Sequence, residues 1–155
     1  MVASPGDVDS FDRAVRLAVY RTIVADGVPP TARELAAELD VPTADLAASL
    51  GRLADAHALV LQPETSSIWM AAPFSAVPTP FDVSVGDRRY FANCIWDALG
   101  VPACLHADAR IDSSCPDCGE PLRLEVRDGA LEEPADGVLH FAIPAARWWE
   151  DIGAT

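Results

Sequence analysis

The sequence predicts an α+β protein in two parts, a module of three helices and a hairpin followed by a small α+β domain. Apolar residues recur at helical spacing through the first third of the chain. Short apolar runs bounded by turn residues dominate the rest, and a proline-rich stretch separates the two parts. We place the winged-helix-like module at residues 1–71, an extended linker at 72–84 and the second domain at 85–155.

The first two helices have clear end signals. Residues 9–26 carry apolar side chains at helical spacing, and Gly27 with the two prolines that follow ends the helix. A second helix is expected over residues 31–39. There Thr31 is the N-cap and Glu34 follows three residues later, which is the capping-box pattern.

A third helix and a hairpin complete the module. The helix is expected within residues 41–59, capped by Thr43, and its core positions are Leu46, Leu50 and Leu53. Residues 58–62 and 67–71 read as two short strands around a turn. Three helices followed by a hairpin form a winged helix-turn-helix pattern.

The charges of the third helix argue against DNA binding. Its only basic residue is Arg52, and it also carries Asp45 and Asp55, whereas major-groove readers need arginine, lysine or amide side chains. The whole chain has a formal net charge of −13. Phosphate binding needs clustered positive charge, so we expect neither a nucleic-acid partner nor an anionic membrane surface.

The second domain is predicted to begin with a helix. Asp87 is placed to cap a helix over residues 88–99, which Gly100 and Pro102 would end. About three antiparallel strands and a final helix follow. The strands are expected at residues 109–112, 121–126 and 138–143, and the helix at 144–152.

The composition indicates a cytoplasmic protein with reduced thiols. All 11 basic residues are arginines, and the abundance of Ala, Asp, Gly and Pro is typical of a high-GC, actinobacterial-like genome. The start of the chain lacks the pattern of a signal peptide, and no apolar run reaches a membrane-spanning length of about 18 residues. In the cytoplasm, cysteines are reduced thiols, metal ligands or catalytic groups more often than disulfides. The four cysteines are Cys94, Cys104, Cys115 and Cys118.

Cys115 and Cys118 form a C-P-D-C-G turn. Such a turn is a common half of a zinc site, because it points both thiolates inward. The remaining ligands would come from Cys94, Cys104, His106 or His140. A redox role for the pair is the weaker interpretation, since the motif follows a strand rather than opening a helix whose N-terminus would lower a thiol pKa.

A second candidate site lies in the stretch FANCIWDAL, residues 91–99. On a helix, Cys94 and Asp97 share one face, one turn apart. A carboxyl group in an apolar helix is costly unless it is paired or protonated. A raised pKa would make Asp97 a proton donor beside a soft nucleophile.

The same residues carry a family resemblance. DRRYFANCIWDALGVPA followed by ARIDSSCPDCGEPLRLEV resembles the organomercurial lyases, also called alkylmercury lyases. LHFAIPAARWWEDI is similar to a later strand and helix of that family, so the resemblance covers most of residues 10–150. It implies a lyase-like second domain and a small-molecule organomercurial substrate. No cofactor is required, and mercury is the substrate and product metal.

The resemblance assigns roles to three residues. Cys94 corresponds to the family's first mercury-binding thiol, Asp97 to its catalytic acid, and Cys115 to a cysteine that is usually structural. The chemistry agrees, because mercury is a soft cation that prefers thiolate ligands. Thiolates on mercury push electron density onto the bound carbon, and an adjacent acid can then protonate that carbon.

One departure from the family pattern matters. The family has a second catalytic cysteine just before the strand that matches residues 138–143, where this sequence has Asp136 or Gly137. Cys118 or Cys104 would have to supply a replacement thiolate. Mercury binding would then involve Cys94 with Cys115 or Cys118.

Three functions stay open from the sequence. The first is protonolysis of a carbon–mercury bond. The second is proton transfer on a metal-free organic substrate by a repurposed relative, since fold does not fix function. The third is a non-catalytic site for zinc or another soft metal on Cys115 and Cys118 with Cys94, Cys104 or His106. The oligomeric state is left open.

Overall fold

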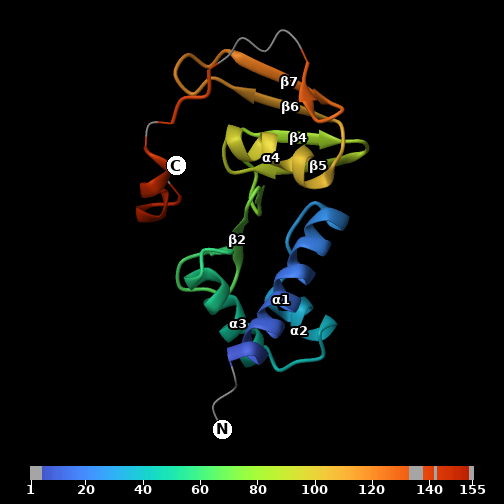
Figure 1. Ribbon diagram of the computed structural model, residues 1–155, viewed down its shortest axis with the longest axis vertical. Helices are drawn as coiled ribbons and strands as arrows, with labels where there is room; N and C mark the ends of the chain where they lie inside the picture. The colour runs from blue at the N-terminus through green and yellow to red at the C-terminus, as the bar shows by residue number, and fades with distance from the viewer. Residues whose placement is uncertain (1–4, 133–137, 142, 154–155) are drawn as a thin grey trace.

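The computed structural model describes residues 5–132, 138–141 and 143–153, and it confirms an α+β fold. Helices α1, α2 and α3 lie at one end of an elongated molecule and α4 lies toward the other (Figure 1). The described strands form one antiparallel sheet in the order β1-β2-β3-β5-β4-β6-β7-β8. Among these residues, no helix combines the length and hydropathy that a bilayer span requires.

Helices α1 (Pro5–Asp26), α2 (Ala32–Glu38) and α3 (Thr43–Asp55) pack on one another through buried aliphatic side chains. The fully buried positions include Val15, Val19, Leu35, Leu46 and Leu50. These are positions that the helical spacing of the sequence assigns to one stripe on each helix. The hairpin of β1 and β2 follows α3, as expected.

The caps of these helices agree only in part with the sequence analysis. The Thr31 side chain accepts the backbone N–H of Glu34 at 3.2 Å, and Glu34 accepts the backbone N–H of Thr31 at 2.7 Å, so the capping box is confirmed. Thr43 as a cap is wrong. It is the first residue of α3, and Pro42 occupies the N-cap without a side-chain hydrogen bond.

The sheet continues from the hairpin into the second half of the chain. Its strands are β1 (Val60–Leu61), β2 (Ile68–Ala71), β3 (Phe74–Ser75), β4 (Asp82–Val85), β5 (Arg88–Ala92), β6 (Ala109–Ser114), β7 (Pro121–Arg127) and β8 (Ala130–Leu131). The predicted linker, residues 72–84, therefore contains β3 and most of β4. Its prolines, Pro73, Pro78 and Pro80, all lie outside the strands, so they remove no donor from the ladders.

The helix predicted over residues 88–99 is wrong in its first half. Residues 88–92 form β5, in which Tyr90 and Ala92 are buried and alternate with more exposed neighbours. Helix α4 begins at Ile95 and continues to Leu105. Pairing with β3 and β4 outweighs the local helical pattern, because it buries one face of β5 under α4.

The end of α4 also differs from the prediction. Gly100 and Pro102 lie inside the helix, and His106 is the C-cap with a left-handed φ of 49°. Gly100 has a different role, because a Cβ built on it would lie 3.1 Å from the Cβ of Pro73. The glycine thus permits close approach of α4 to the segment that leads into β3.

The strand predicted over residues 138–143 is absent from its described part, residues 138–141 and 143, since 142 lies outside the described residues. The place beside β7 is taken by β8, which the sequence analysis did not predict. The second part of the chain accordingly contains β5 to β8 rather than about three strands. The final helix is present as the short 3-10 helix η1 (Ala145–Glu150).

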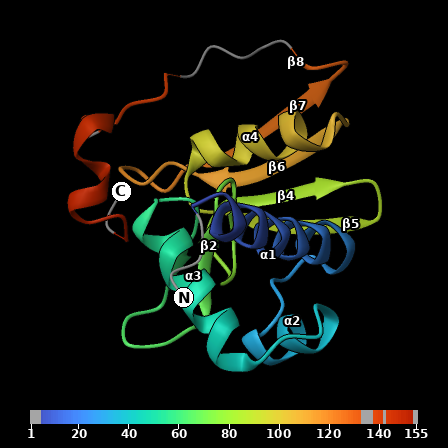
Figure 2. The same ribbon diagram turned by 60° about the horizontal axis from the view of Figure 1, so that its bottom comes forward.

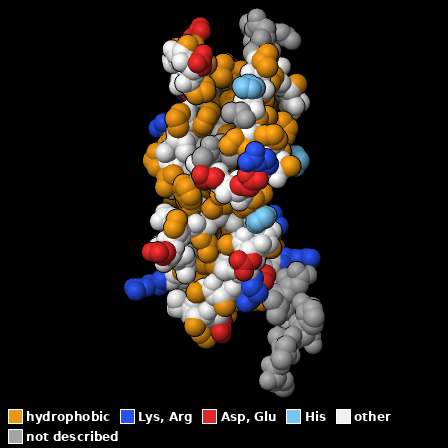
Figure 3. Space-filling view, turned by 90° about the vertical axis from the view of Figure 1, so that its left-hand side faces the viewer, with side chains coloured by type: hydrophobic (Ala, Val, Ile, Leu, Met, Phe, Trp, Pro, Cys, Tyr) orange, Lys and Arg blue, Asp and Glu red, His pale blue; other side chains and the backbone are white. Residues whose placement is uncertain are grey.

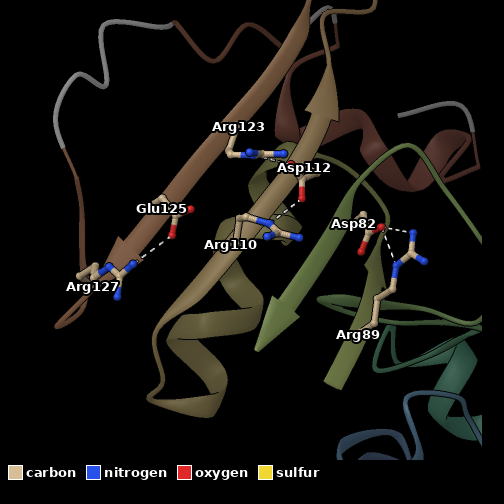
Figure 4. Close-up of polar contacts among 7 residues, drawn as sticks. All are labelled: Asp82, Arg89, Arg110, Asp112, Arg123, Glu125 and Arg127. Atoms are coloured by element: carbon tan, nitrogen blue, oxygen red, sulfur yellow. Dashed lines mark hydrogen bonds and ion pairs between the residues drawn. The ribbon is translucent and has the colours of Figure 1, made fainter. Parts of the chain in front are cut away.

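The two faces of the central sheet have different characters. Val83, Tyr90 and Ile111 are buried on the face that α4 covers. The opposite face carries ion pairs of Arg89 with Asp82, and of Arg110 and Arg123 with Asp112 (Figure 4). Any apolar site near α4 therefore lies on the covered face or at the ends of its strands.

Candidate functional site

Two of the predicted site segments leave the sheet at the same end. Strands β5 and β6 both pair antiparallel with β4, so they run in the same direction, and Phe91, Asp82 and Asp112 lie in one cross-strand row. Cys94 follows Phe91 by three residues and Cys115 follows Asp112 by three. With one strand between them, β5 and β6 are about 10 Å apart. The start of α4 and the β6–β7 turn accordingly lie at one end of the sheet (Figures 1 and 2).

Cys94 and Asp97 share the first turn of α4 rather than its middle. Cys94 is the N-cap, with extended backbone, and its Sγ accepts the backbone N–H of Asp97 at 3.5 Å. Burial raises the pKa of the Cys94 thiol, and the negative charge of Asp97 acts in the same direction. The N–H groups of Asp97 and Trp96 partly offset this rise, because they stabilise a thiolate at the helix N-terminus.

Burial also raises the pKa of the Asp97 carboxyl. One hydrogen bond opposes the rise, since Asn93 Nδ2 donates to Asp97 Oδ2 at 2.9 Å. Asn93 thus fixes the orientation of the acid from the residue before the N-cap. Sequence reasoning missed Asn93, although its position four residues before Asp97 was a signal for such a contact.

Buried oxygens without a hydrogen-bond partner lie near this end of the sheet, on both of its faces. Within the described residues, the buried side-chain atoms without a hydrogen-bond partner are Asp82 Oδ1, Asn93 Oδ1 and Ser113 Oγ. Ser113 lies two residues after the buried Ile111, so its side chain is on the face that α4 covers. A buried oxygen without a partner is a place where a water or ligand donor binds. Sequence reasoning also missed Ser113, for which it offered no signal.

The Cys115–Cys118 turn is closed by its backbone. Cys115 N–H donates to Glu120 O and Gly119 N–H donates to Cys115 O, both at 2.8 Å. The Cys115 sulfur accepts the backbone N–H groups of Cys118 and Asp117 and the thiol of Cys118, and these contacts lower the pKa of Cys115. Cys115 is half-buried and Cys118 is exposed.

Two other predicted ligands lie elsewhere. Cys104 is near the far end of α4, about 15 Å along the helix axis from Cys94, and His106 caps that far end. The described part of the chain contains no group of three or more His, Cys, Asp or Glu side chains placed to hold a metal ion. A zinc site that joins Cys115 and Cys118 to Cys94, Cys104 or His106 is therefore not assembled there. Asp136 and Gly137, which stand where the family has its second cysteine, lie outside the described residues.

A chain of aromatic contacts begins in the first turn of α4. Trp96, 56% exposed, meets Phe141 at a ring distance of 6.3 Å, and Phe141 meets Trp148 at 5.3 Å. The C-terminal segment, residues 138–141 and 143–153, thus packs against the start of α4. It also reaches the helical module, where Trp149 stacks on His57 at 3.8 Å. The face of the molecule on which this segment lies is largely hydrophobic (Figure 3).

Comparison with known proteins identifies relatives of this arrangement. A family model described as alkylmercury lyase (MerB) matches residues 74–155, which include Cys94, Asp97 and the Cys115–Cys118 turn. Alkylmercury lyases of Bacillus cereus and Clostridium butyricum are each 33% identical to the chain over 70 residues, which cover 44% of this chain and 32% of the relative. The match thus spans about a third of the length of each curated relative.

A solved structure agrees with the family match. The crystal structure of the mercury-bound form of MerB2 superposes with a TM-score of 0.60 and 26% sequence identity, covering 81% of this chain and 66% of that one. The family model alone spans more than half of the chain. The chain therefore belongs to the alkylmercury lyase family.

Proposed function

We propose that the protein cleaves the carbon–mercury bond of small organomercurials by protonolysis, with Cys94 as the mercury-binding thiol and Asp97 as the acid. The observation that carries this proposal is the pairing of both groups in the first turn of α4, where Cys94 Sγ meets the N–H of Asp97 at 3.5 Å. The mercury bound in the related MerB2 crystal structure supports the choice of metal.

Binding begins with a neutral thiol. Because burial raises the pKa of Cys94, its sulfur holds a proton until a soft cation replaces it. Mercury binds the sulfur, and Asp97 takes the released proton, which its raised pKa favours. The N–H groups of Trp96 and Asp97 stabilise the sulfur as it takes on negative charge.

Cleavage returns that proton to carbon. The electron pair of the carbon–mercury bond accepts the proton from Asp97, and the hydrocarbon leaves. Mercury stays on Cys94 and on the small thiolate that carried it in, so no second cysteine is needed for this step. Atoms and charges balance, because the proton lost by Cys94 is the proton gained by carbon.

Asn93 positions the acid. Its Nδ2 holds Asp97 Oδ2 at 2.9 Å, and this leaves the second carboxyl oxygen to exchange a proton with the substrate. Trp96, in the first turn of α4, meets Phe141 at 6.3 Å between ring centroids, and we expect this pair to form an apolar wall beside the bound substrate. Such a wall suits the hydrocarbon part of the substrate, which gains from leaving water.

The test is hydrocarbon release from a methylmercury– or phenylmercury–thiol complex, measured by gas chromatography of the headspace. Cys94→Ala and Asp97→Asn should each lower the release at least 100-fold, which is the usual scale for a positioned acid. Asp97→Asn should still bind mercury. Cys104→Ser is the matched control, because it removes a thiol about 15 Å from the site and should leave the rate unchanged.

Wild-type protein that binds the organomercurial and releases no hydrocarbon would overturn the proposal. Release that persists in Cys94→Ala would also overturn it. In either case, proton transfer by Asp97 on a metal-free organic substrate becomes the reading to test next.

A further inference from the structure

The Cys115–Cys118 turn is not used by the proposed cleavage, yet it is built to present two sulfurs together. The turn is closed by the hydrogen bonds Cys115 N–H to Glu120 O and Gly119 N–H to Cys115 O, both 2.8 Å. Cys115 and Cys118 stand three residues apart within this one closed turn, so their side chains leave the same short loop. Gly119, with φ of +74°, supplies the left-handed residue that ends the turn.

Two features suit this pair to a soft cation. Metal–sulfur bonds of about 2.3 Å allow one ion to bridge sulfurs up to about 4.6 Å apart, a span that two cysteines three residues apart in one closed turn can adopt. Hydrogen bonding to the backbone N–H groups of Cys118 and Asp117 lowers the pKa of Cys115, and the same N–H groups would stabilise the negative charge of its sulfur in the complex.

The surroundings favour a two-coordinate ion over zinc. Within the described residues, no third His, Cys, Asp or Glu joins the pair in a metal-binding group. Structural zinc takes four ligands, whereas a large soft ion is satisfied by two thiolates. Cys118 is exposed, so an ion can arrive from solution.

We propose that Cys115 and Cys118 form a two-thiolate site that binds the mercuric ion, separately from Cys94. The site lies at the same end of the sheet as Cys94, on a strand about 10 Å away. The turn thus serves as the acceptor of the mercury that cleavage leaves on Cys94. The role of the turn as an acceptor rests on the proposed function, whereas its binding of the mercuric ion does not.

The transfer is a ligand exchange without oxidation or reduction. Two sulfur–mercury bonds form, to Cys115 and Cys118, and the two bonds to the delivering sulfurs break. The two thiol protons of the turn pass to the departing thiolates. Mercury stays divalent throughout, and Cys94 regains the proton that the next cycle needs.

The experiment uses the full chain with mercuric ion delivered as its complex with an excess of a monothiol. The starting variant is Cys94→Ala/Cys104→Ser, which keeps only the turn cysteines. It should retain about one mercury per chain after dialysis against the monothiol. Chelation by two linked thiolates should tighten binding about 100-fold or more over one. Adding Cys118→Ser should lose that gain, with mercury quantified by atomic absorption.

Retention that is equal with and without Cys118→Ser would overturn the inference, as would a starting variant that loses its mercury to the monothiol. Circular dichroism of the Cys118→Ser variant checks that it folds, and Cys118→Ala serves as a second variant at this exposed position. The outcome is independent of catalysis. Mercury retained by the starting variant, together with no hydrocarbon release by the wild type, would contradict only the proposed function. Hydrocarbon release by the wild type, together with no mercury retained by the starting variant, would contradict only this inference.

Discussion

The sulfur of Cys94 accepts the backbone N–H of Asp97 at 3.5 Å, so the thiol and the acid occupy the N-cap and the third residue of one helix. This arrangement couples the two groups in a specific way. The helix N-terminus stabilises a sulfur that becomes negative, while burial keeps the neighbouring carboxyl inclined to hold a proton. Under the proposed function, the thiol gives its proton to this acid when mercury binds.

Burial of Asp97 should cost stability at neutral pH. Its pKa is raised in the folded protein, so above the ordinary aspartate pKa of about 3.9 the native state holds more protons than the unfolded state. The free energy of unfolding then falls as pH rises from about 4 to the folded pKa. Asp97→Asn lacks this penalty, and we expect it to be more stable than wild type at pH 7.

Urea unfolding between pH 4 and pH 8 measures this effect. The advantage of Asp97→Asn should shrink toward pH 4, where the wild-type carboxyl is protonated in both states. Asp45→Asn, which changes an exposed carboxylate in the first turn of α3, is the control for the loss of one negative charge. A variant that is less stable than wild type by the same amount at every pH would contradict the assignment.

Asn93 should affect the pKa of Asp97 as well as its orientation. Its hydrogen bond lowers the pKa of Asp97 against the effect of burial, so Asn93→Ala should raise that pKa further. The alkaline limb of the kcat–pH profile should then move to higher pH, because the donor keeps its proton longer. We also expect kcat at its optimum to fall roughly 10- to 100-fold through lost positioning. A lower kcat with an unmoved limb would mean that Asn93 acts only on structure.

Arg52, the basic residue of α3, forms an ion pair with Asp12 of α1. Arg52 Nε and Ser49 Oγ donate to Asp12 at 2.9 and 2.6 Å, and Ser49 is fully buried. Asp12→Ala should lower the free energy of unfolding by about 1–3 kcal/mol, since it leaves the Ser49 hydroxyl without an acceptor. Asp12→Ala/Ser49→Ala should recover part of that loss, and chemical denaturation measures both. A double variant less stable than the single one would contradict this account.

The same contact predicts an acid dependence. Arg52, with help from Ser49, holds the pKa of Asp12 below its usual range. The stabilisation is therefore present above about pH 4 and is lost as pH falls through the lowered folded pKa. The difference in unfolding free energy between wild type and Asp12→Ala should shrink in acid, where the native carboxylate is neutralised. A difference that stays constant down to pH 2 would rule out the ion pair as its source.

The sequence was sufficient where local chemistry decides the structure. The capping box of Thr31 and Glu34 needs only four residues, and it formed as predicted. Cys94 and Asp97 were paired by their spacing of three, which brings them together at the start of a helix as well as in its middle. Both features follow from helical geometry alone.

Long-range pairing explains most of the errors. Residues 88–92 could form a helix or a strand, and their partners β3 and β4 made them a strand. Residues 138–141 have the composition of a strand, but β8 occupies the edge of β7. The unpartnered oxygen of Ser113 emerges only when β6 is placed under α4. Such features depend on which segments meet, and periodicity does not encode that.

Two glycines in helices should respond to alanine in opposite ways. In α3, a Cβ built on Gly51 meets nothing within 4 Å, so Gly51→Ala should stabilise the protein by about 1 kcal/mol through helix propensity. In α4, a Cβ on Gly100 lies 3.1 Å from the Cβ of Pro73, and the proline ring has little freedom to yield. Gly100→Ala gains the same propensity but should be destabilising overall, by about 1–3 kcal/mol, through overpacking.

The Gly100 contact also bears on the site. If α4 moves away from Pro73 to admit the new methyl group, then Cys94 and Asp97 at its first turn move with it. A displacement of about 1 Å can cost up to 100-fold in rate, so hydrocarbon release by Gly100→Ala should fall while Gly51→Ala matches wild type. Thermal denaturation and headspace chromatography on the two variants measure both effects. If Gly100→Ala is as stable and as active as Gly51→Ala, then the approach of α4 to Pro73 does not position the site.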